Sequence, residues 1–304
     1  MSPRYLATVA VFLLGAAPGG AQPRIALQYD DALAKADFPS PAARLTINGR
    51  TAWFLFDTGA GVHVMASWFA KAAGLEAGDV FTDGVHGIDS TGKTLPLRGL
   101  RDLSATRDDG GAMALGQVAI TDFPPEFERS GVGGALSPQL LAGPGQATAL
   151  DLRVPELRFE PFRDAVHRLG ARVVPRERAQ FCGSRDDPVP NLVFAIQVKA
   201  RRREGVLLLD SGATATKVLA QSAMVHDLRL ESGGETLGIA GQGQAFSVAR
   251  RVRIQFAGYR ATVDARVVDL PARPCNSDGL LGLDALRRCA LVVGQQELAI
   301  RCGR

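Results

Sequence analysis

Two aspartates in near-identical surroundings are the residues of this chain best suited to do chemistry. Asp57 opens the run Asp57-Thr-Gly-Ala60, and Asp210 opens the run Asp210-Ser-Gly-Ala213. Each aspartate follows three apolar residues, a pattern that predicts the end of a buried strand. Two carboxyl groups held about 3 Å apart cannot both ionise cheaply, so such a pair shares one proton and its apparent pKa values split. One member could then activate a water molecule while the other delivers a proton, which is what amide hydrolysis needs.

The two motifs belong to an internal repeat of about 150 residues. Further landmarks follow each aspartate in the same order, with spacings that agree closely. In the first half they are Leu75, Gly87-Ile88, Asp122-Phe-Pro124 and Gly131-Val-Gly-Gly134, and in the second half Leu228, Gly238-Ile239, Asp269-Leu-Pro271 and Gly279-Leu-Leu-Gly282. The chain is therefore expected to form two similar halves that each position one aspartate.

The pattern inside each half is mostly β. Residues 45–56 predict two strands joined by an Asn48-Gly49 hairpin turn, and residues 25–29 alternate as an edge strand does. Helical spacing is limited to 66–73 and its counterpart 219–227. These features predict an all-β fold of two β-barrel-like lobes with short helices. The expected divisions are a leader at 1–21, a first lobe at 22–165, a linker at 166–190 and a second lobe at 191–304.

The composition is that of an ordinary globular chain. Its 304 residues are 46% hydrophobic and 22% charged, which argues against disorder. The 34 Gly and 17 Pro favour strands joined by turns over a helix bundle. The net charge is only +4, and the densest basic run, Arg201-Arg202-Arg203, is expected at an exposed hairpin tip. A patch of that size is too small for a nucleic-acid interface.

The N-terminus carries the pattern of a secretory signal. Arg4 precedes an apolar stretch, Tyr5 to Ala17, which small residues follow up to Ala21. That stretch is too short to span a membrane comfortably, and no other segment approaches a span. We therefore expect an exported protein, periplasmic or secreted, with an uncleaved interfacial anchor as the alternative. Whether residues 22–43 are a removable pro-segment stays open.

All four cysteines lie in the second half and fit two disulfides. Residues 289–302 predict two short apolar strands around a turn, and symmetric folding puts Cys289 opposite Cys302. That pairing leaves Cys182 with Cys275. The chain has no C-x-x-C motif and its histidines show no ligand spacing, so we expect no metal site.

The paired motifs resemble those of the aspartic peptidases, the group that holds the bilobal pepsin-like enzymes and the homodimeric retropepsins. The resemblance rests on both Asp motifs and on the glycine elements that end at Gly134 and Gly282. It covers about residues 42–160 and 190–301. It implies a single-chain, pseudo-twofold monomer of the acid-protease fold, without a cofactor, whose active site lies between the lobes.

The resemblance also implies roles for the residues of the two motifs. Asp57 and Asp210 would form the catalytic dyad. The hydroxyls of Thr58 and Ser211 would hold the two loops together, and the glycines that follow them would permit tight loops and close approach. Those glycines are Gly59 and Gly212, while Gly134 and Gly282 are expected to be structural rather than catalytic.

Glycine-bearing hairpins in both halves are candidates for flaps that close over a substrate. Surface hairpins with no such role are the alternative. Neither hairpin carries the Tyr found on the single flap of pepsin-like enzymes, which favours a retropepsin-like arrangement. The candidate residues are Gly87, Ile88 and Gly92 in the first half and Gly238, Ile239 and Gly243 in the second. His63 and His86 are expected to be packed or solvated, because a carboxyl dyad needs no third titrating group.

The function expected from these residues is that of an aspartic endopeptidase acting on an extended polypeptide. Other catalytic plans are poorly supported, because the chain has no Gly-x-Ser-x-Gly elbow and no His-Glu-x-x-His motif. Two alternatives stay open. One is a module on the same fold that binds a peptide or protein without cutting it, and the other is a narrow processing peptidase with one partner protein.

Overall fold

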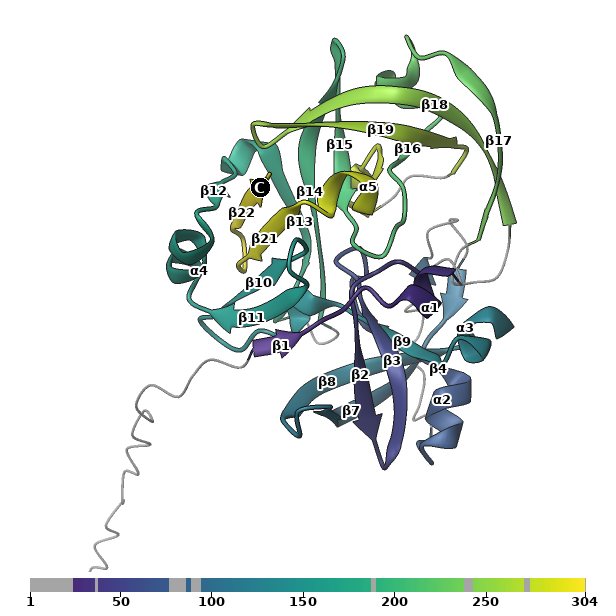
Figure 1. Ribbon diagram of the computed structural model, residues 1–304, viewed down its shortest axis with the longest axis vertical. Coiled ribbons are helices and arrows are strands. Elements are labelled where there is room, and N and C mark those ends of the chain that lie inside the picture. Colours follow the sequence, from purple (N-terminus) through teal and green to yellow (C-terminus); the bar gives the residue numbers. More distant parts are fainter. Residues whose placement is uncertain are drawn as a thin grey trace, which may run out of the picture.

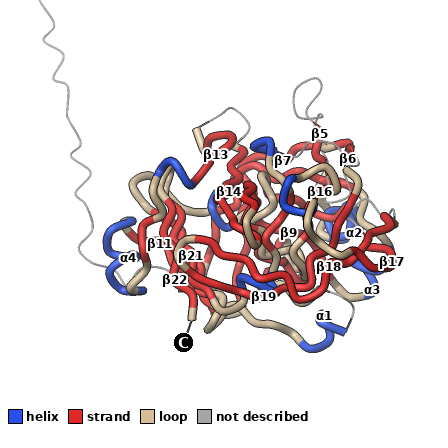
Figure 2. The backbone as a smooth tube through the Cα atoms, turned by 90° about the horizontal axis from the view of Figure 1, so that it is seen from above, coloured by secondary structure: helices blue, strands red, loops and turns tan. Residues whose placement is uncertain are grey.

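The computed structural model describes residues 24–35, 38–76, 86–88, 94–186, 190–237, 243–270 and 274–303. Strands make up most of this part, with short helices between them, as Figure 2 shows. The predicted all-β class is therefore confirmed. Within the described residues, none of the helices is long and apolar enough to cross a bilayer.

The first lobe is a closed barrel of six strands in the lower half of Figure 1. Strand β7 pairs back onto β2, which closes the ring. The predicted Asn48-Gly49 turn joins β2 to β3, and both residues have the positive φ that such a turn requires. The order is β2 (Ala42–Ile47), β3 (Arg50–Phe56), β9 (Val132–Leu136), β4 (His63–Ala66), β8 (Ala112–Thr121) and β7 (Arg98–Arg107).

The second lobe repeats this order of strands. The pairing of β14 with β18 closes the ring in the same way. Strands β13 (Ala179–Ser184) and β17 (Leu230–Leu237) extend its two ends. The ring is β14 (Asn191–Ala200), β15 (Arg203–Leu209), β20 (Gly279–Leu281), β16 (Lys217–Leu219), β19 (Tyr259–Val268) and β18 (Gly243–Phe256). The two barrel-like lobes expected from the internal repeat are therefore present.

A third sheet joins the two halves of the chain. It is built of β1 (Arg24–Ala26), β11 (Glu156–Glu160), β10 (Ala147–Asp151), β21 (Cys289–Val293), β22 (Leu298–Cys302) and β12 (Arg172–Val173). Strand β10 of the first half pairs with β21 of the second, from Thr148 opposite Val293 to Asp151 opposite Ala290. Helix α4 (Phe162–Leu169) packs its buried Ala165 and Leu169 against this sheet. Backbone hydrogen bonds therefore tie one half of the chain to the other.

Two expectations from the sequence need correction. The stretch expected as a linker, 166–190, is largely structured, because it contains β12, a 3-10 turn at Arg176–Arg178 and β13. Strand β13 pairs with β14, from Ala179 opposite Ile196 to Ser184 opposite Asn191. The helix expected at 219–227 is only a 3-10 turn, Ala223–Val225, whereas its first-half counterpart forms α2 (Ser67–Ala72). Ser222 caps that turn by accepting a hydrogen bond from the Met224 amide.

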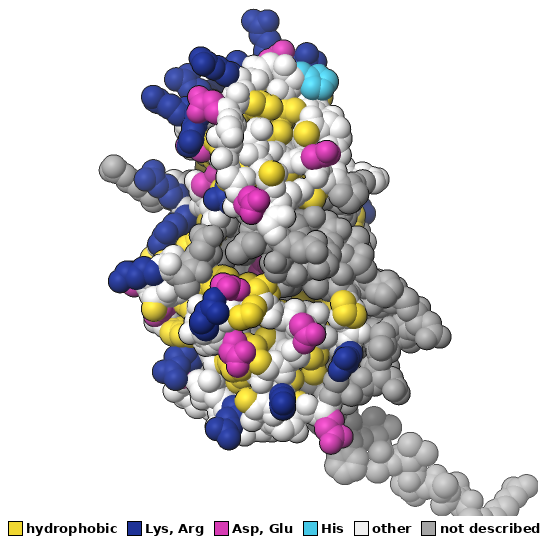
Figure 3. Space-filling view, turned by 90° about the vertical axis from the view of Figure 1, so that its right-hand side faces the viewer, with side chains coloured by type: hydrophobic (Ala, Val, Ile, Leu, Met, Phe, Trp, Pro, Cys, Tyr) yellow, Lys and Arg dark blue, Asp and Glu magenta, His cyan; other side chains and the backbone are white. Residues whose placement is uncertain are grey.

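Three other short helices and one hairpin are among the described elements. They are α1 (Asp31–Lys35), α3 (Pro125–Arg129), α5 (Leu283–Leu286) and the hairpin of β5 (His86–Ile88) with β6 (Thr94–Pro96). Arg201 to Arg203 stand exposed at the tip of the β14–β15 hairpin, as expected. Figure 3 shows Lys and Arg side chains gathered at the second-lobe end of the face in view.

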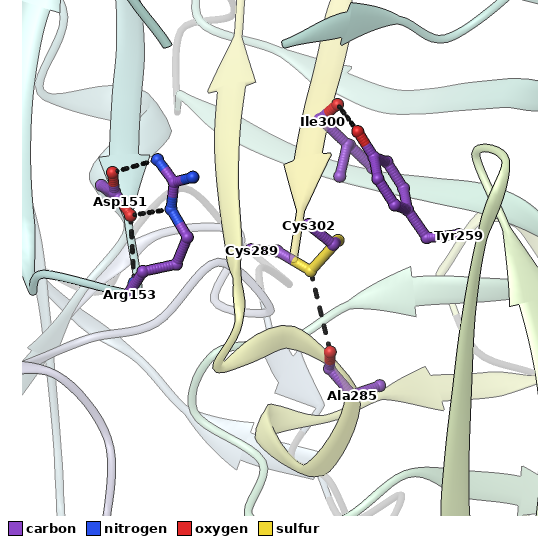
Figure 4. Close-up of a disulfide and its surroundings, with 7 residues drawn as sticks. All are labelled: Asp151, Arg153, Tyr259, Ala285, Cys289, Ile300 and Cys302. Carbon is purple, nitrogen blue, oxygen red and sulfur yellow. Dashed lines mark hydrogen bonds and ion pairs between the residues drawn. A yellow bond between two sulfur atoms is a disulfide. The ribbon is translucent and has the colours of Figure 1, made fainter. Parts of the chain in front are cut away.

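Both disulfides are those that the sequence predicts, Cys182 with Cys275 and Cys289 with Cys302. Cys289 and Cys302 face each other across the antiparallel pair β21–β22. Figure 4 shows this disulfide beside Ala285 of α5 and near the hydrogen bond that Tyr259 donates to the Ile300 carbonyl. The bridge therefore fixes the C-terminal hairpin of the joining sheet. Two disulfides fit an oxidising, exported environment.

The N-terminal segment packs as part of the fold. Strand β1 pairs with β11 at the edge of the joining sheet. The Leu33 side chain of α1 is 1% exposed and packs with Leu55, Phe127 and Val132 of the first lobe. Residues 24–35 and 38–43 are therefore integral to the described structure.

Candidate active site

Each aspartate of the two motifs follows the central strand of a three-strand group. Strand β3 lies between β2 and β9 and ends at Phe56, and β15 lies between β14 and β20 and ends at Leu209. The Asp57 amide donates to the Leu136 carbonyl at 2.8 Å, and the Asp210 amide donates to the Leu281 carbonyl at 3.0 Å. The residues before each aspartate are buried, as the apolar runs predict. Both loops thus start from rigid backbone.

The structure brings the two carboxyl groups together. The Gly212 amide donates to Asp57 Oδ1 at 3.1 Å and to Asp210 Oδ1 at 2.9 Å, so both side chains share one donor. Asp57 Oδ1 also accepts from the Gly59 amide at 2.7 Å, and Asp210 Oδ1 accepts from the Ala213 amide at 2.8 Å. Asp210 is buried and Asp57 is half-buried.

The glycines of the two motifs are required by this close approach. A Cβ atom on Gly59 would lie 2.5 Å from Asp210 Cγ, which no real side chain tolerates. A Cβ atom on Gly212 would overlap the Asp57 carboxyl in the same way. Each glycine therefore makes room for the aspartate of the other lobe, and the requirement is reciprocal.

The hydroxyls of Thr58 and Ser211 link the two loops through a symmetric set of four hydrogen bonds. Thr58 Oγ1 donates to the Leu209 carbonyl at 2.8 Å and accepts from the Ser211 amide at 3.0 Å. Ser211 Oγ donates to the Phe56 carbonyl at 2.8 Å and accepts from the Thr58 amide at 3.0 Å. Both side chains are almost fully buried. The hydrogen bonds lock the two strand ends together beneath the carboxyl groups.

This arrangement raises the pKa of Asp57 well above its usual range. Burial is the main cause, because it disfavours the charged carboxylate, and the negative charge of Asp210 and a hydrogen bond between the two side chains add to it. The Gly59 and Gly212 amides oppose the shift by donating to the carboxylate. One carboxyl of the pair therefore holds its proton over a pH range in which an isolated aspartate would have lost it.

A family model described as aspartyl protease matches residues 43–106, which run from β2 to β7 and contain the Asp57 loop. The match supports assigning the chain to the aspartic peptidase family. No curated protein matches the chain significantly.

The glycine elements of the two halves correspond to each other differently from what the sequence repeat suggests. Phe54 pairs with Gly134 and Leu207 pairs with Gly279, so Gly134 is equivalent to Gly279 and not to Gly282. A Cβ atom at Gly134 would overlap the Val64 carbonyl, and at Gly279 it would overlap the Lys217 carbonyl. Gly282 lies against the backbone of 215–216 and is equivalent to Ser137. Each of these glycines allows another backbone segment, at residue 64 or at 215–218, to approach closely.

His63 is packed inside the first lobe. It is 2% exposed, and its Nδ1 accepts a hydrogen bond from the Ser137 amide at 3.0 Å. Burial lowers the pKa of His63 from 6.5 to about 4, so the imidazole is neutral near pH 7. This agrees with the expectation of a packed histidine. The side chain of His86 lies outside the described residues.

Gln139 is a polar residue of this site that sequence reasoning missed. It lies in the 3-10 turn Pro138–Leu140 after β9 and is fully buried. Its Nε2 donates to the carbonyls of Ala60 at 2.9 Å and of Leu192 at 2.6 Å. With the corrected correspondence of the glycine elements, Gln139 is equivalent to Asp284 of the second lobe. The mismatched alignment of the two halves concealed this relation.

The flap candidates fall only partly on described residues. Gly87 and Ile88 belong to β5, which pairs with β6, and Gly243 begins β18, which pairs with β17. Gly92, Gly238 and Ile239 lie outside the described residues. Within the described part of the chain, no group of His, Cys, Asp and Glu side chains could hold a metal ion.

Proposed function

We propose that the chain is an aspartic endopeptidase whose catalytic pair is Asp57 and Asp210. The observation that supports this best is the Gly212 amide shared between the two carboxyl groups, because it places both within reach of one small molecule. Family membership supports a protease in general. The dyad itself is our proposal, with Thr58, Ser211, Gly59 and Gly212 as its supporting residues.

The proposed reaction follows from the uneven protonation of the pair. At working pH one carboxyl is ionised and the other keeps its proton, because the pKa of Asp57 is raised by burial and by the charge of Asp210. The ionised member removes a proton from a water molecule, whose oxygen bonds to the substrate carbonyl carbon. The protonated member donates to the carbonyl oxygen, and a proton then passes to the leaving amine as the C–N bond breaks. Because the two groups are coupled, neither role belongs permanently to one aspartate.

The decisive experiment compares Asp57→Asn and Asp210→Asn with Asp227→Asn in cleavage of a denatured protein from pH 3 to pH 8. Asp227 is an exposed second-lobe aspartate paired with Arg203, so it serves as the matched control. We expect each dyad variant to lose about 1,000-fold in kcat, the size typical of positioned acid–base groups. The control variant should stay within about twofold of the wild type, a surface change of that kind being nearly neutral.

The outcomes separate the competing functions. Wild-type rates in either dyad variant would end the proposal. Tight peptide binding with no turnover by the wild type would identify a binding module, and cleavage restricted to one partner protein would identify a processing peptidase. Folding of Asp57→Asn can be checked by its stability. The raised pKa means that ionising Asp57 costs stability in the wild type. The free energy of unfolding of Asp57→Asn should therefore rise relative to that of the wild type as pH rises above about 4.

We also propose that the chain is exported with removal of residues 1–21. The two disulfides support an oxidising compartment. Sequencing of the mature N-terminus tests the cleavage. A mature chain beginning beyond residue 43 would contradict both the cleavage site and the integral packing of β1 and α1.

A further inference from the structure

Gln139 makes contacts to both lobes from a single buried amide group. Its Nε2 lies 2.6 Å from the Leu192 carbonyl, 2.9 Å from the Ala60 carbonyl and 3.3 Å from the Thr58 carbonyl. Thr58 and Ala60 belong to the Asp57 loop, defined here as residues 57–61, whereas Leu192 is in β14 of the second lobe. Because all three neighbours are acceptors, only the NH₂ end of the amide can face them.

A direct backbone contact lies beside this amide. The Leu192 amide donates to the Gly61 carbonyl at 3.1 Å, so the start of β14 binds the same loop. A Cβ atom on Gly61 would overlap the Asn191 side chain, which shows how closely the two segments approach. The Asp57 loop is therefore attached to the second lobe by contacts additional to the Thr58–Ser211 hydrogen bonds.

The second lobe has no matching attachment to the first at the equivalent place. Asp284, the counterpart of Gln139, accepts from the Thr216 amide at 3.0 Å and from the Thr216 hydroxyl at 2.7 Å. It also accepts from the Ala285 amide at 3.0 Å. These partners all belong to the second lobe itself. Among the described residues, Gln139 therefore reaches from the first lobe to the second, whereas the hydrogen bonds of Asp284 stay within the second lobe.

We propose that Gln139 is a positioning residue that fixes the Asp57 loop against the second lobe and thereby sets the relative placement of the two carboxyl groups. This rests on the proposed function. Gln139 is fully buried and acts on the reaction only through the loop. Removing its amide leaves three carbonyls with a lost donor and frees the loop to shift. Misplacing a reacting group by about 1 Å can cost about 100-fold in rate, so the loss falls on kcat.

The test uses Gln139→Met, which keeps the length of the side chain and removes the donor, and Gln139→Glu. The matched control is Thr148→Val. Thr148 is also buried and donates to the Pro138 carbonyl of the same 3-10 turn at 2.9 Å, but it contacts neither the Asp57 loop nor β14 in that bond. We expect Gln139→Met to lower kcat by about 10- to 100-fold with KM within about threefold. Thr148→Val should change kcat by less than about threefold, because its bond lies outside the loop.

The pH profile of Gln139→Glu gives a readout that a merely structural role would not produce. The carboxyl group that this substitution introduces carries, when protonated, one O–H that can donate to a carbonyl, whereas its ionised form has only acceptors. We therefore expect kcat of Gln139→Glu, relative to the wild type, to recover as pH falls, while Gln139→Met shows no such recovery. A profile of Gln139→Glu parallel to that of the wild type would contradict the proposal.

Hydrogen exchange provides a second measurement that needs no activity. In Gln139→Met, the amides of 58–61 and 191–193 should exchange at least about tenfold faster than in Thr148→Val, because both segments lose their shared donor. Equal exchange in these two variants, or equal kcat, would overturn the proposal. If the wild type cleaves nothing in an Asp57-dependent way, the proposed function fails, and exchange alone then decides whether Gln139 couples the loop to the second lobe.

Discussion

The Asp57 loop and the Asp210 loop share one set of hydrogen bonds and differ in the side chains that support each loop. Thr58 and Ser211 make reciprocal contacts with distances that agree within each pair. His63 and Gln139 in the first lobe are equivalent in position to Thr216 and Asp284 in the second. The repeat therefore preserves the geometry of the carboxyl pair, while each lobe supports its own loop by different chemistry.

The Thr216–Asp284 support of the second loop is self-contained, whereas Gln139 supports the first loop across the lobes. Thr216 Oγ1 donates to Asp284 and accepts from the Gly282 amide at 3.3 Å, so its hydroxyl is used in both directions. His63 uses Nδ1 alone, and its buried Nε2 has no hydrogen-bond partner in the described part of the chain. A buried polar atom without a partner costs stability. Burial lowers the pKa of His63 and raises that of Asp284, so each loop should respond to pH through its own titrating group.

The largest expected effect comes from the two motif glycines. Gly59→Ala would push its Cβ into the Asp210 carboxyl, and Gly212→Ala would push its Cβ into the Asp57 carboxyl. Both variants should lose at least about 100-fold in kcat, because the carboxyl pair must separate or turn. Gly74→Ala is a control for a glycine with open space around it, although its positive φ will cost some stability. A strong loss of kcat in only one of the two variants, Gly59→Ala or Gly212→Ala, would show that the two glycines are not equivalent in this packing.

The next effect tests the hydroxyls that join the loops. Thr58→Val and Ser211→Ala each remove two buried hydrogen bonds and leave a backbone amide and a carbonyl unpaired. Each should lower the free energy of unfolding by about 4 kcal/mol, measured by urea denaturation. Because the two hydroxyls bind the same two strand ends, the double variant should lose less than the sum. Strictly additive losses, or losses that differ more than twofold between the variants, would contradict the symmetric linkage.

The sequence predicted the parts of the site that the two halves share. The Asp motifs, the buried strands before them and the Cys289–Cys302 disulfide follow from local patterns in the chain, and the second disulfide follows by elimination. The correspondence of Gly134 with Gly279 could not be read this way, because Gly131-Val-Gly-Gly134 offers glycines in more than one register. Strand pairing with β3 and β15 decides that register.

Contacts between the halves escaped the sequence for a different reason. The expected linker holds β13, whose strand character becomes clear only when β14 lies beside it. The joining sheet of β10 with β21, and the Gln139 contacts, depend equally on segments far apart in the chain. Local periodicity carries no information about such partners. The helix expected at 219–227 failed because one Ser-capped 3-10 turn can match a short helical spacing.

A pH-dependent effect should distinguish the two loops. Burial lowers the pKa of His63 to about 4 in the folded chain, against 6.5 for an exposed imidazole. The unfolded chain therefore binds this proton more tightly, and stability is lost as pH falls from about 6.5 to about 4. The contribution of this one group is about 3 kcal/mol. The second-lobe residue equivalent to His63 is Thr216, so the substitution to test is His63→Thr. It should remove that part of the pH dependence of the free energy of unfolding, measured by urea denaturation. If the free energy of unfolding of His63→Thr depends on pH over this range as steeply as that of the wild type, the prediction is wrong.

The smallest expected effect concerns Ser40, a residue of the N-terminal segment whose side chain reaches the Asp210 loop. Ser40 Oγ donates to the Gly212 carbonyl at 3.3 Å, a single long hydrogen bond from the N-terminal segment. Ser40→Ala should therefore cost about 1 kcal/mol or less and change kcat by less than about threefold. Gln139→Met acts on the other loop through three carbonyls and should cost far more in kcat. If Ser40→Ala reduces kcat as strongly as Gln139→Met does, both loops depend on outside attachment, and the self-contained support of the Asp210 loop is wrong.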